Sequence, residues 1–200
     1  MNKILENLHQ DHQNLARLWD LLGRELNIFK EGGLPDYELV GTILDYCLNY
    51  PDLCHHPTEN LVFDKLAERD LGSISAIGDL KQEHENLGAL TWRISNALSN
   101  VLEDEQLPKD WFLDIANNFL IFSRNHLQME EVLFFPAARK NLTDQDWADL
   151  EASIENVEDP LFGSDKQEKY QSLFQDIMNW KEMLEEMDEA EAREKTSKSF

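Results

Sequence analysis

Apolar residues recur every three or four positions along most of the chain, which is the spacing of one face of an α-helix. The pattern predicts four long helices, over residues 2–29, 36–66, 75–102 and 108–140. We find no convincing alternation of apolar and polar residues, the mark of a strand. Three prolines, Pro51, Pro57 and Pro136, are expected to kink or interrupt the second and fourth helices. Four long helices joined by short links predict an all-α, up-down-up-down four-helix bundle.

The chain after about residue 141 has a different character. We therefore expect residues 1–141 to form the bundle and residues 142–200 to form a C-terminal helical extension with a polar tail. Thr143, with Asp146 three residues later, predicts the start of a short helix. A last amphipathic helix is expected over 166–189. The extension is expected to pack across one end of the bundle, to form a homodimer contact, or to present a surface for another partner around Trp180.

Composition narrows the class of protein. The 200 residues carry a net charge of −22, which repels polyanions, so nucleic acids and anionic membrane surfaces are excluded as partners. No apolar run approaches the ~20 residues of a membrane span, and no signal peptide is recognisable. The spacing of Cys47 and Cys54 fits neither a disulfide framework nor a C-x-x-C motif. A reduced, cytoplasmic protein is the expectation.

Each predicted helix places one histidine on its apolar stripe. These histidines are His12, His55, His84 and His126. Two stripes add a glutamate four residues later, Glu59 in HHPTENLVF and Glu130 in HLQMEEVLFFP. Residues four apart lie on one helix face, ~6 Å from each other, so both members of a pair can reach the same site.

Buried acids of this kind need a compensating charge. An unpaired carboxylate in an apolar core costs several kcal/mol, and two would remove most of the ~5–15 kcal/mol that stabilises a domain. A single inward histidine is more often a hydrogen-bonded core residue, and a single glutamate is more often solvated. The set of six favours a bound metal pair, and imidazole with carboxylate suits iron, manganese or zinc.

The sequence does not decide the roles of the two remaining histidines, His9 and His56. We prefer His55 to His56 as a ligand because only His55 lies four residues before Glu59. His56 and His9 are each interpreted as an extra ligand, a hydrogen-bond partner of a ligand, or a surface residue.

The motifs resemble the hemerythrin-like HHE cation-binding domain over about residues 1–140. HHPTENLVF and HLQMEEVLFFP are the specific parts, and DHQNL and QEHENL match the flanks of the other two histidines. The resemblance implies two iron ions, most simply as an Fe–O–Fe centre, with zinc or manganese as alternatives. It implies four terminal ligands and two bridging ligands. The terminal ligands would be His12, His55, His84 and His126, and the bridging ligands Glu59 and Glu130.

One departure from oxygen-carrying hemerythrin affects the expected function. The residue one turn after His84 is Gly88, which cannot ligate a metal. Six protein ligands and a bridging oxide leave two of twelve positions open, unless an extra residue fills one, whereas a simple oxygen carrier leaves one. We therefore expect a non-haem di-iron protein that binds or senses dioxygen, nitric oxide or redox state. The alternatives are a di-iron peroxidase or nitric-oxide reductase, an iron-centre repair protein, and a metal-storage or structural protein.

Overall fold

The structure is a computed structural model that describes residues 2–103, 108–154, 158–180 and 182–183. Within these ranges the chain is all-α and contains no strand. It divides into two compact units, residues 1–158 and residues 159–200. The polar tail predicted at the C-terminus lies outside the described residues. No described helix combines the length and apolar character that a membrane span needs.

The first unit contains eight α-helices and two π-helical turns among its described residues. In chain order these are α1 (Lys3–Lys30), α2 (Tyr37–Tyr50), η1 (Pro51–His55), α3 (His56–Arg69), α4 (Leu71–Ile77), α5 (Leu80–Leu102), α6 (Lys109–Met129), η2 (Glu130–Phe134), α7 (Phe135–Asn141) and α8 (Asp144–Ser153).

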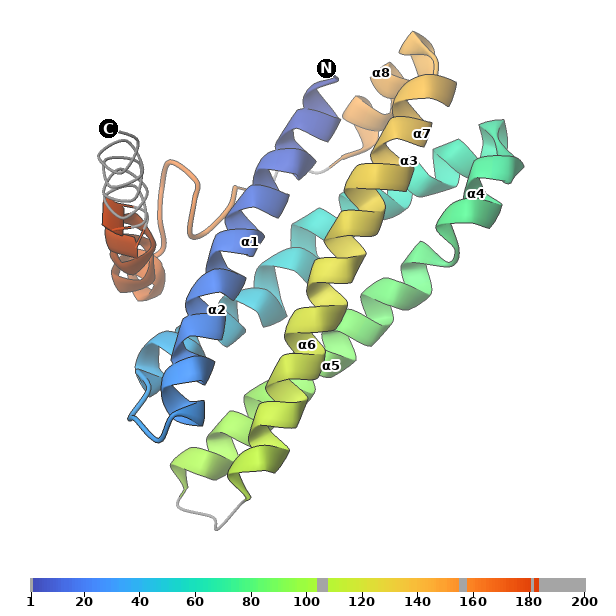
Figure 1. The fold of residues 1–200 in the computed structure, drawn as a ribbon. Coiled ribbons are helices and arrows are strands. Elements are labelled where there is room, and N and C mark those ends of the chain that lie inside the picture. The colour runs from blue at the N-terminus through green and yellow to red at the C-terminus, as the bar shows by residue number, and fades with distance from the viewer. Residues whose placement is uncertain (1, 104–107, 155–157, 181, 184–200) are drawn as a thin grey trace, which may run out of the picture. The chain divides into compact units, whose positions relative to one another are not determined.

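Four long helical segments pack side by side (Figure 1). α1 contacts α2 and α6, and α5 contacts the same two helices, so the four segments surround a common interior. The second segment runs from α2 through η1 into α3, and the fourth runs from α6 through η2 into α7. Each of these two segments is therefore continuous despite its prolines.

Local signals set where the first two segments begin and end. The Asn2 side chain accepts a hydrogen bond from Ile4 N and caps α1. Gly32 adopts a φ of 88°, which costs glycine little, and follows the last residues of α1. Asp36 caps α2 by accepting a 3.0 Å bond from Leu39 N. Residues 31–36, between these two helices, thus form the turn that reverses the chain.

The third predicted helix starts too early. Residues 75–77 belong to the short helix α4, and Gly78 then adopts a φ of 94° that ends it. Asp79 caps the new helix α5 by accepting from Gln82 N at 3.1 Å. The apolar spacing continues across this break, so periodicity alone did not show it.

The prolines of the second segment are accommodated by η1. Pro57 has no N–H to donate to the carbonyl four residues before it. In the π-turn, His56 N–H instead donates to Pro51 O, five residues back. The extra residue in this turn changes the helical phase, so the face presented by His55 and His56 differs from that of a regular α-helix.

The fourth segment repeats this arrangement. Phe135 N–H donates to Glu130 O, again five residues back, and Pro136 follows. Both π-turns therefore lie directly at an H-x-x-x-E motif, with a proline two residues after the turn. Single π-turns inside α-helices occur frequently at functional sites.

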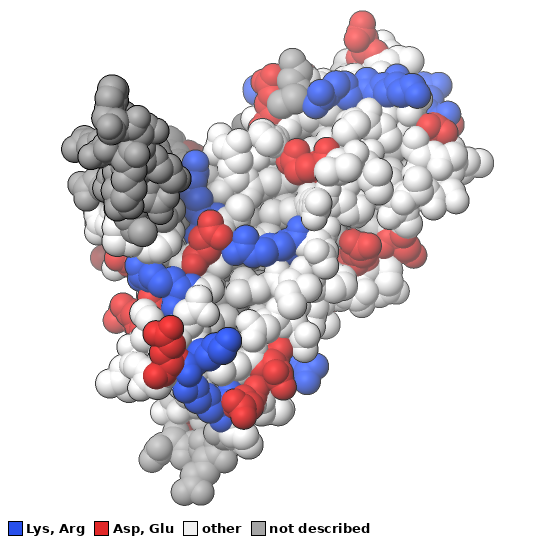
Figure 2. Space-filling model, in the orientation of Figure 1, with Lys and Arg blue, Asp and Glu red and all other residues white. Residues whose placement is uncertain are grey.

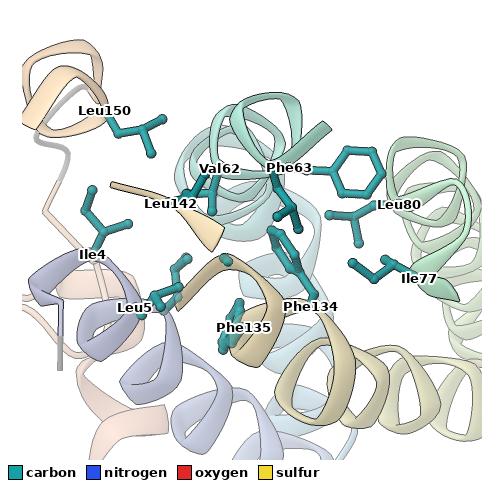
Figure 3. Close-up of a cluster of buried hydrophobic side chains, with 13 residues drawn as sticks. Ile4, Leu5, Val62, Phe63, Ile77, Leu80, Phe134, Phe135, Leu142 and Leu150 are labelled. Atoms are coloured by element: carbon teal, nitrogen blue, oxygen red, sulfur yellow. The ribbon is translucent and has the colours of Figure 1, made fainter. Parts of the chain in front are cut away.

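A cluster of buried apolar side chains lies just beyond the two H-x-x-x-E motifs (Figure 3). It draws residues from seven elements, including Ile4 and Leu5 of α1 and Leu150 of α8. Phe63 and Phe134 meet edge to face with ring centroids 5.9 Å apart. Because Phe63 and Phe134 each lie four residues after a motif glutamate, this cluster closes one end of the interior against water.

The helix α8 belongs to the first compact unit, although the sequence analysis assigned its residues to the extension. The predicted capping box is confirmed, since Thr143 and Asp146 exchange bonds at the start of α8. Arg69 of α3 holds Asp146 through two hydrogen bonds of 3.0 and 2.7 Å. This contact ties α8 to the end of α3.

The second unit contains the 3-10 turn η3 (Glu168–Tyr170) and helical residues 171–180. The helix predicted over 166–189 thus begins later than expected, at residue 171, and residues 181 and 184–189 of the prediction lie outside the described residues. Phe162 and Phe174 meet edge to face within this unit.

The described surface carries charges of both signs. On the face shown in Figure 2, Lys and Arg alternate with Asp and Glu, and uncharged areas separate them. The negative net charge is therefore not collected in one patch on this face.

Candidate metal centre

Seven buried side chains, five histidines and two glutamates, meet in the interior between the four helical segments. They are His12, His55, His56, Glu59, His84, His126 and Glu130. All six residues predicted from the sequence are among them. The seventh is His56, which sequence analysis left open and which the structure buries beside the others.

The seven side chains form two groups that share Glu59. One group contains His12, His55, Glu59 and Glu130, and the other contains His56, Glu59, His84 and His126. Within each group one ligand-type atom per residue lies within 4.8 Å of those of the other members. Each group can therefore hold one metal ion, and Glu59 can reach both.

The two glutamates present their oxygens to different histidines. His12 Nε2 lies 3.4 Å from Glu59 Oε1 and 3.3 Å from Glu130 Oε2. His84 Nε2 lies 3.4 Å from Glu59 Oε2 and 3.5 Å from Glu130 Oε1. Each carboxylate thus turns one oxygen toward each group, which is the orientation of a bridge between two ions.

The i,i+4 pairs have the same close approach. His55 Nε2 lies 3.4 Å from Glu59 Oε1, and His126 Nε2 lies 3.1 Å from Glu130 Oε1. Two ligand atoms that share one metal ion at ~2.1 Å, at right angles, lie ~3 Å apart. The observed separations are close to that spacing.

Seven inward atoms of this site have no hydrogen-bond partner in the part of the chain that the structure describes. Among the described residues, His12 Nε2, His84 Nε2, His126 Nε2 and all four oxygens of Glu59 and Glu130 find no hydrogen-bond partner. Buried polar atoms are almost always paired, because leaving one unpaired costs ~1–3 kcal/mol. Seven such atoms converging on one place fit cations, which satisfy imidazole and carboxylate lone pairs together.

The outward nitrogens of four histidines are each held by an acceptor on another helical segment. In each pair Nδ1 donates to the acceptor. The pairs are His12 with Glu131 (2.7 Å), His55 with Asp11 (3.2 Å), His84 with Asn60 (3.1 Å) and His126 with Glu83 (2.8 Å). A proton on Nδ1 leaves the lone pair of Nε2 directed inward, as a metal ligand requires.

These acceptors form a closed ring around the site. Asp11 on α1 holds a histidine of η1, Asn60 on α3 holds one of α5, Glu83 on α5 holds one of α6, and Glu131 on η2 holds one of α1. Each acceptor is the immediate sequence neighbour of an inward group. Every segment therefore supplies a ligand to the centre and a support for the next segment.

His9 lies outside the metal groups. Its side chain is 43% exposed, and its Nδ1 lies 2.9 Å from the same Glu131 oxygen that accepts from His12. His9 is therefore a partly exposed residue that contacts the carboxylate supporting His12, a role that sequence analysis did not consider. Glu131 itself is anchored from two sides.

The charges of the metal-free site depend on one another. Burial alone would lower the pKa of His126, but the charge and close approach of Glu130 and the hydrogen bond to Glu83 raise it to about 10. Burial alone would raise the pKa of Glu59, but the neighbouring histidines lower it to about 2. The pKa values of His12 and His84 are raised in the same way as that of His126, so these three imidazoles favour the protonated form beside the two carboxylates when no cation is bound. A metal ion replaces those protons with its own charge.

Stacked rings pack around the ligand groups. The His56 and His84 rings are stacked with centroids 4.0 Å apart, and His12 stacks on Phe135 at 5.0 Å. Phe135 belongs to the apolar cluster of Figure 3, so that cluster directly abuts the site. Ring packing and outer hydrogen bonds together restrict the rotation of each imidazole.

A cavity of about 30 Å³ lies beside the centre. Its wall includes His55 from one group and His56 and His126 from the other. Its other wall residues are mostly apolar, and they include Gly88, one turn after His84. A volume of ~10–15 Å³ holds one water-sized probe, so the cavity has room for about two heavy atoms.

Sequence reasoning missed the four outer acceptors. The available signal was their position directly before or after an inward residue, as in Asp11–His12 and Glu130–Glu131. That signal is weak, because charged residues next to an apolar stripe usually face solvent. Their role depends on a partner from another helix.

Comparison with known proteins agrees with the geometry. No curated protein and no solved structure was found to match the chain. A family model, described as the hemerythrin HHE cation binding domain, matches residues 3–138. This range includes all seven buried ligand-type residues and both π-turns. The chain belongs to the hemerythrin HHE cation-binding family.

Proposed function

We propose that this chain is a cytoplasmic non-haem di-iron protein that binds or senses dioxygen, nitric oxide or redox state. Its first unit would be an up-down-up-down four-helix bundle around the metals. The observation that carries the proposal is the convergence of seven buried ligand-type atoms without partners, from two groups that share Glu59. Imidazole with carboxylate suits iron, zinc or manganese, and we choose iron because the resemblance of the motifs to the HHE domain implies it.

The ligands divide unequally between the two proposed ions. His12 and His55 would bind one ion, His56, His84 and His126 the other, and the two glutamates would bridge them. Two bridging carboxylates would occupy four positions, five histidines would occupy five, and a bridging oxide would occupy two. One of twelve positions would then remain open, on the ion that His12 and His55 would hold.

This count changes the expectation drawn from the sequence. Sequence analysis left two positions open and therefore favoured redox or nitric-oxide chemistry over oxygen carriage. With His56 as a ligand, the number of open positions equals that of a simple oxygen carrier. Ligand counting thus supports the binding of one diatomic molecule and gives no preference between carrier and sensor.

The bound irons would supply the electrons and the coordination position for a diatomic ligand. The chain's contribution is to hold the imidazoles through their Nδ1 hydrogen bonds, and to exclude water. The apolar cluster of Figure 3 covers one end of the centre, and Phe119 and Leu127 line the neighbouring cavity. Such surroundings admit a small uncharged ligand more readily than a hydrated anion.

Metal analysis with absorption spectroscopy tests the proposal. Protein expressed with ample iron should contain two irons per chain, and its oxidised form should show oxo-bridged di-iron bands that azide or nitric oxide changes. Iron-free protein, or protein that retains zinc alone under these conditions, would contradict the proposal. Sustained turnover of peroxide or nitric oxide would identify an enzyme instead of a sensor.

A further inference from the structure

The cavity beside the proposed di-iron centre contains a hydroxyl that the protein does not use. Ser123 lies on α6, three residues before His126, and its side chain is completely buried. Its hydroxyl finds no hydrogen-bond partner among the described residues. Both Ser123 and His126 line the cavity.

The other hydroxyl in the same wall is already hydrogen-bonded. Thr91 of α5 donates a 2.8 Å bond from Oγ1 to Leu87 O, four residues back. Serine and threonine inside helices commonly make this bond to the preceding turn. Ser123 makes no such bond, so its proton remains available to the cavity. Trp19 also lines the wall, and its Nε1 finds no hydrogen-bond partner among the described residues, so it is a second N–H or O–H group that faces this site unpaired.

The cavity has the size of a ligand of about two heavy atoms. Its wall is mostly apolar, with Trp19, Phe119 and Leu127 around the histidines. A ligand there would be small, largely desolvated, and able to accept one hydrogen bond. A diatomic molecule bound at one end and accepting at the other has this character.

From these observations we infer that Ser123 is a specificity-determining residue whose hydroxyl donates a hydrogen bond to the far atom of a diatomic ligand in this cavity. The inference rests on the proposed di-iron function and deepens it. Ser123 does not contact the metals in this scheme. It stabilises the ligand-bound state and discriminates between diatomic ligands that do and do not accept a hydrogen bond.

Nitric oxide is the probe for the test, with the full-length, iron-loaded protein. Wild type, Ser123→Ala, Ser123→Thr and Thr91→Val are compared for iron content, for the N–O stretching frequency of the nitric-oxide adduct, and for the rate of nitric-oxide release. Ser123→Ala should shift the N–O band and release nitric oxide roughly 3- to 10-fold faster, the effect of one lost hydrogen bond. Ser123→Thr restores a hydroxyl and should retain the wild-type band.

Thr91→Val is the matched control, because it removes a hydroxyl whose proton is already bound to Leu87 O. It should leave the N–O band in place. An unchanged band and release rate in Ser123→Ala, with normal iron content, would overturn the role of Ser123 and leave the di-iron proposal standing. Iron-loaded wild type that forms no nitric-oxide adduct would also overturn it. A wild type that binds no iron would overturn the proposed function itself.

Discussion

Glu83 Oε2 accepts a 2.8 Å hydrogen bond from His126 Nδ1, although the two residues lie on different helices and Glu83 directly precedes another inward histidine, His84. Adjacent residues of α5 therefore have different roles. His84 turns inward as a ligand-type group, and Glu83 accepts the hydrogen bond from the histidine of α6. The same division occurs at Asp11–His12, Glu59–Asn60 and Glu130–Glu131. Correct placement of any one imidazole thus depends on its neighbouring helix.

Removal of Glu83 should weaken the metal site without removing a ligand. Glu83→Ala is expected to lower metal affinity ~10–100-fold, the usual effect of losing an acceptor behind a metal-bound histidine. Titration against a competing chelator measures this. Glu85→Ala is the control, since Glu85 is exposed on the same helix and accepts from Gln82. Equal affinities for both variants would show that the Glu83–His126 bond does not support metal binding.

Removal of a bridging carboxylate should have a larger effect. Glu130→Ala is expected to lose at least one of the two proposed ions, because Glu130 is completely buried and both its oxygens face histidines. Elemental analysis of purified protein measures the loss. Glu151→Ala, which changes an exposed glutamate of α8, should retain full metal content. A Glu130→Ala protein with unaltered metal content would remove this residue from the site.

Chelation of the metals should destabilise the folded chain. A ligand present at about 100 times its Kd stabilises the native state by ~2.7 kcal/mol, which corresponds to roughly 5–10 °C in Tm for a chain of this size. Thermal unfolding with and without a strong chelator measures the difference. In His126→Ala the chelator should have a much smaller effect. A Tm that chelation leaves unchanged in wild type would show that the buried groups hold no ion.

Acid should weaken the contact between α3 and α8. The Asp146 carboxylate accepts bonds from Arg69 first, and then from the N–H and hydroxyl of Thr143, which together lower its pKa. Because the folded state then binds this proton more weakly than the unfolded chain, the contribution is complete above pH ~4 and is lost as pH falls toward the lower, folded-state pKa.

Comparison with Asp146→Asn isolates this contribution. Urea unfolding of chelated protein should show wild type more stable than Asp146→Asn near neutral pH, with the difference shrinking as pH falls below ~4. Use of chelated protein removes the contribution of metal loss in acid. If the difference in unfolding free energy between wild type and Asp146→Asn stayed constant over this pH range, the charge of Asp146 would not contribute to stability.

Much of the site follows from the helical period. His12, His84 and His126 lie on regular apolar stripes, so their inward positions could be read from the spacing of the surrounding leucines and phenylalanines. Glu59 and Glu130 follow their histidines by four residues, and this spacing holds in the structure for both pairs. The all-α class follows from the same pattern.

The place of His56 did not follow from the period. A regular helix turns consecutive residues well apart, so sequence analysis preferred His55 as the ligand and left the role of His56 open. The π-turn η1 changes the phase between Pro51 and His55, and both imidazoles then lie buried. The prolines predicted an irregularity in the second helix. They did not show that the helix would continue through a π-turn with one extra residue instead of ending.

By itself, the sequence determined which residues lie on the inward face of each helix, because side-chain direction within a helix depends on local backbone geometry. It therefore determined the six predicted site residues and the helical class. Only the tertiary structure decided the ring of outer acceptors, the burial of His56, and the cavity with its unused Ser123 hydroxyl. These features depend on which helices are neighbours and on how far each is rotated, and long-range packing sets both.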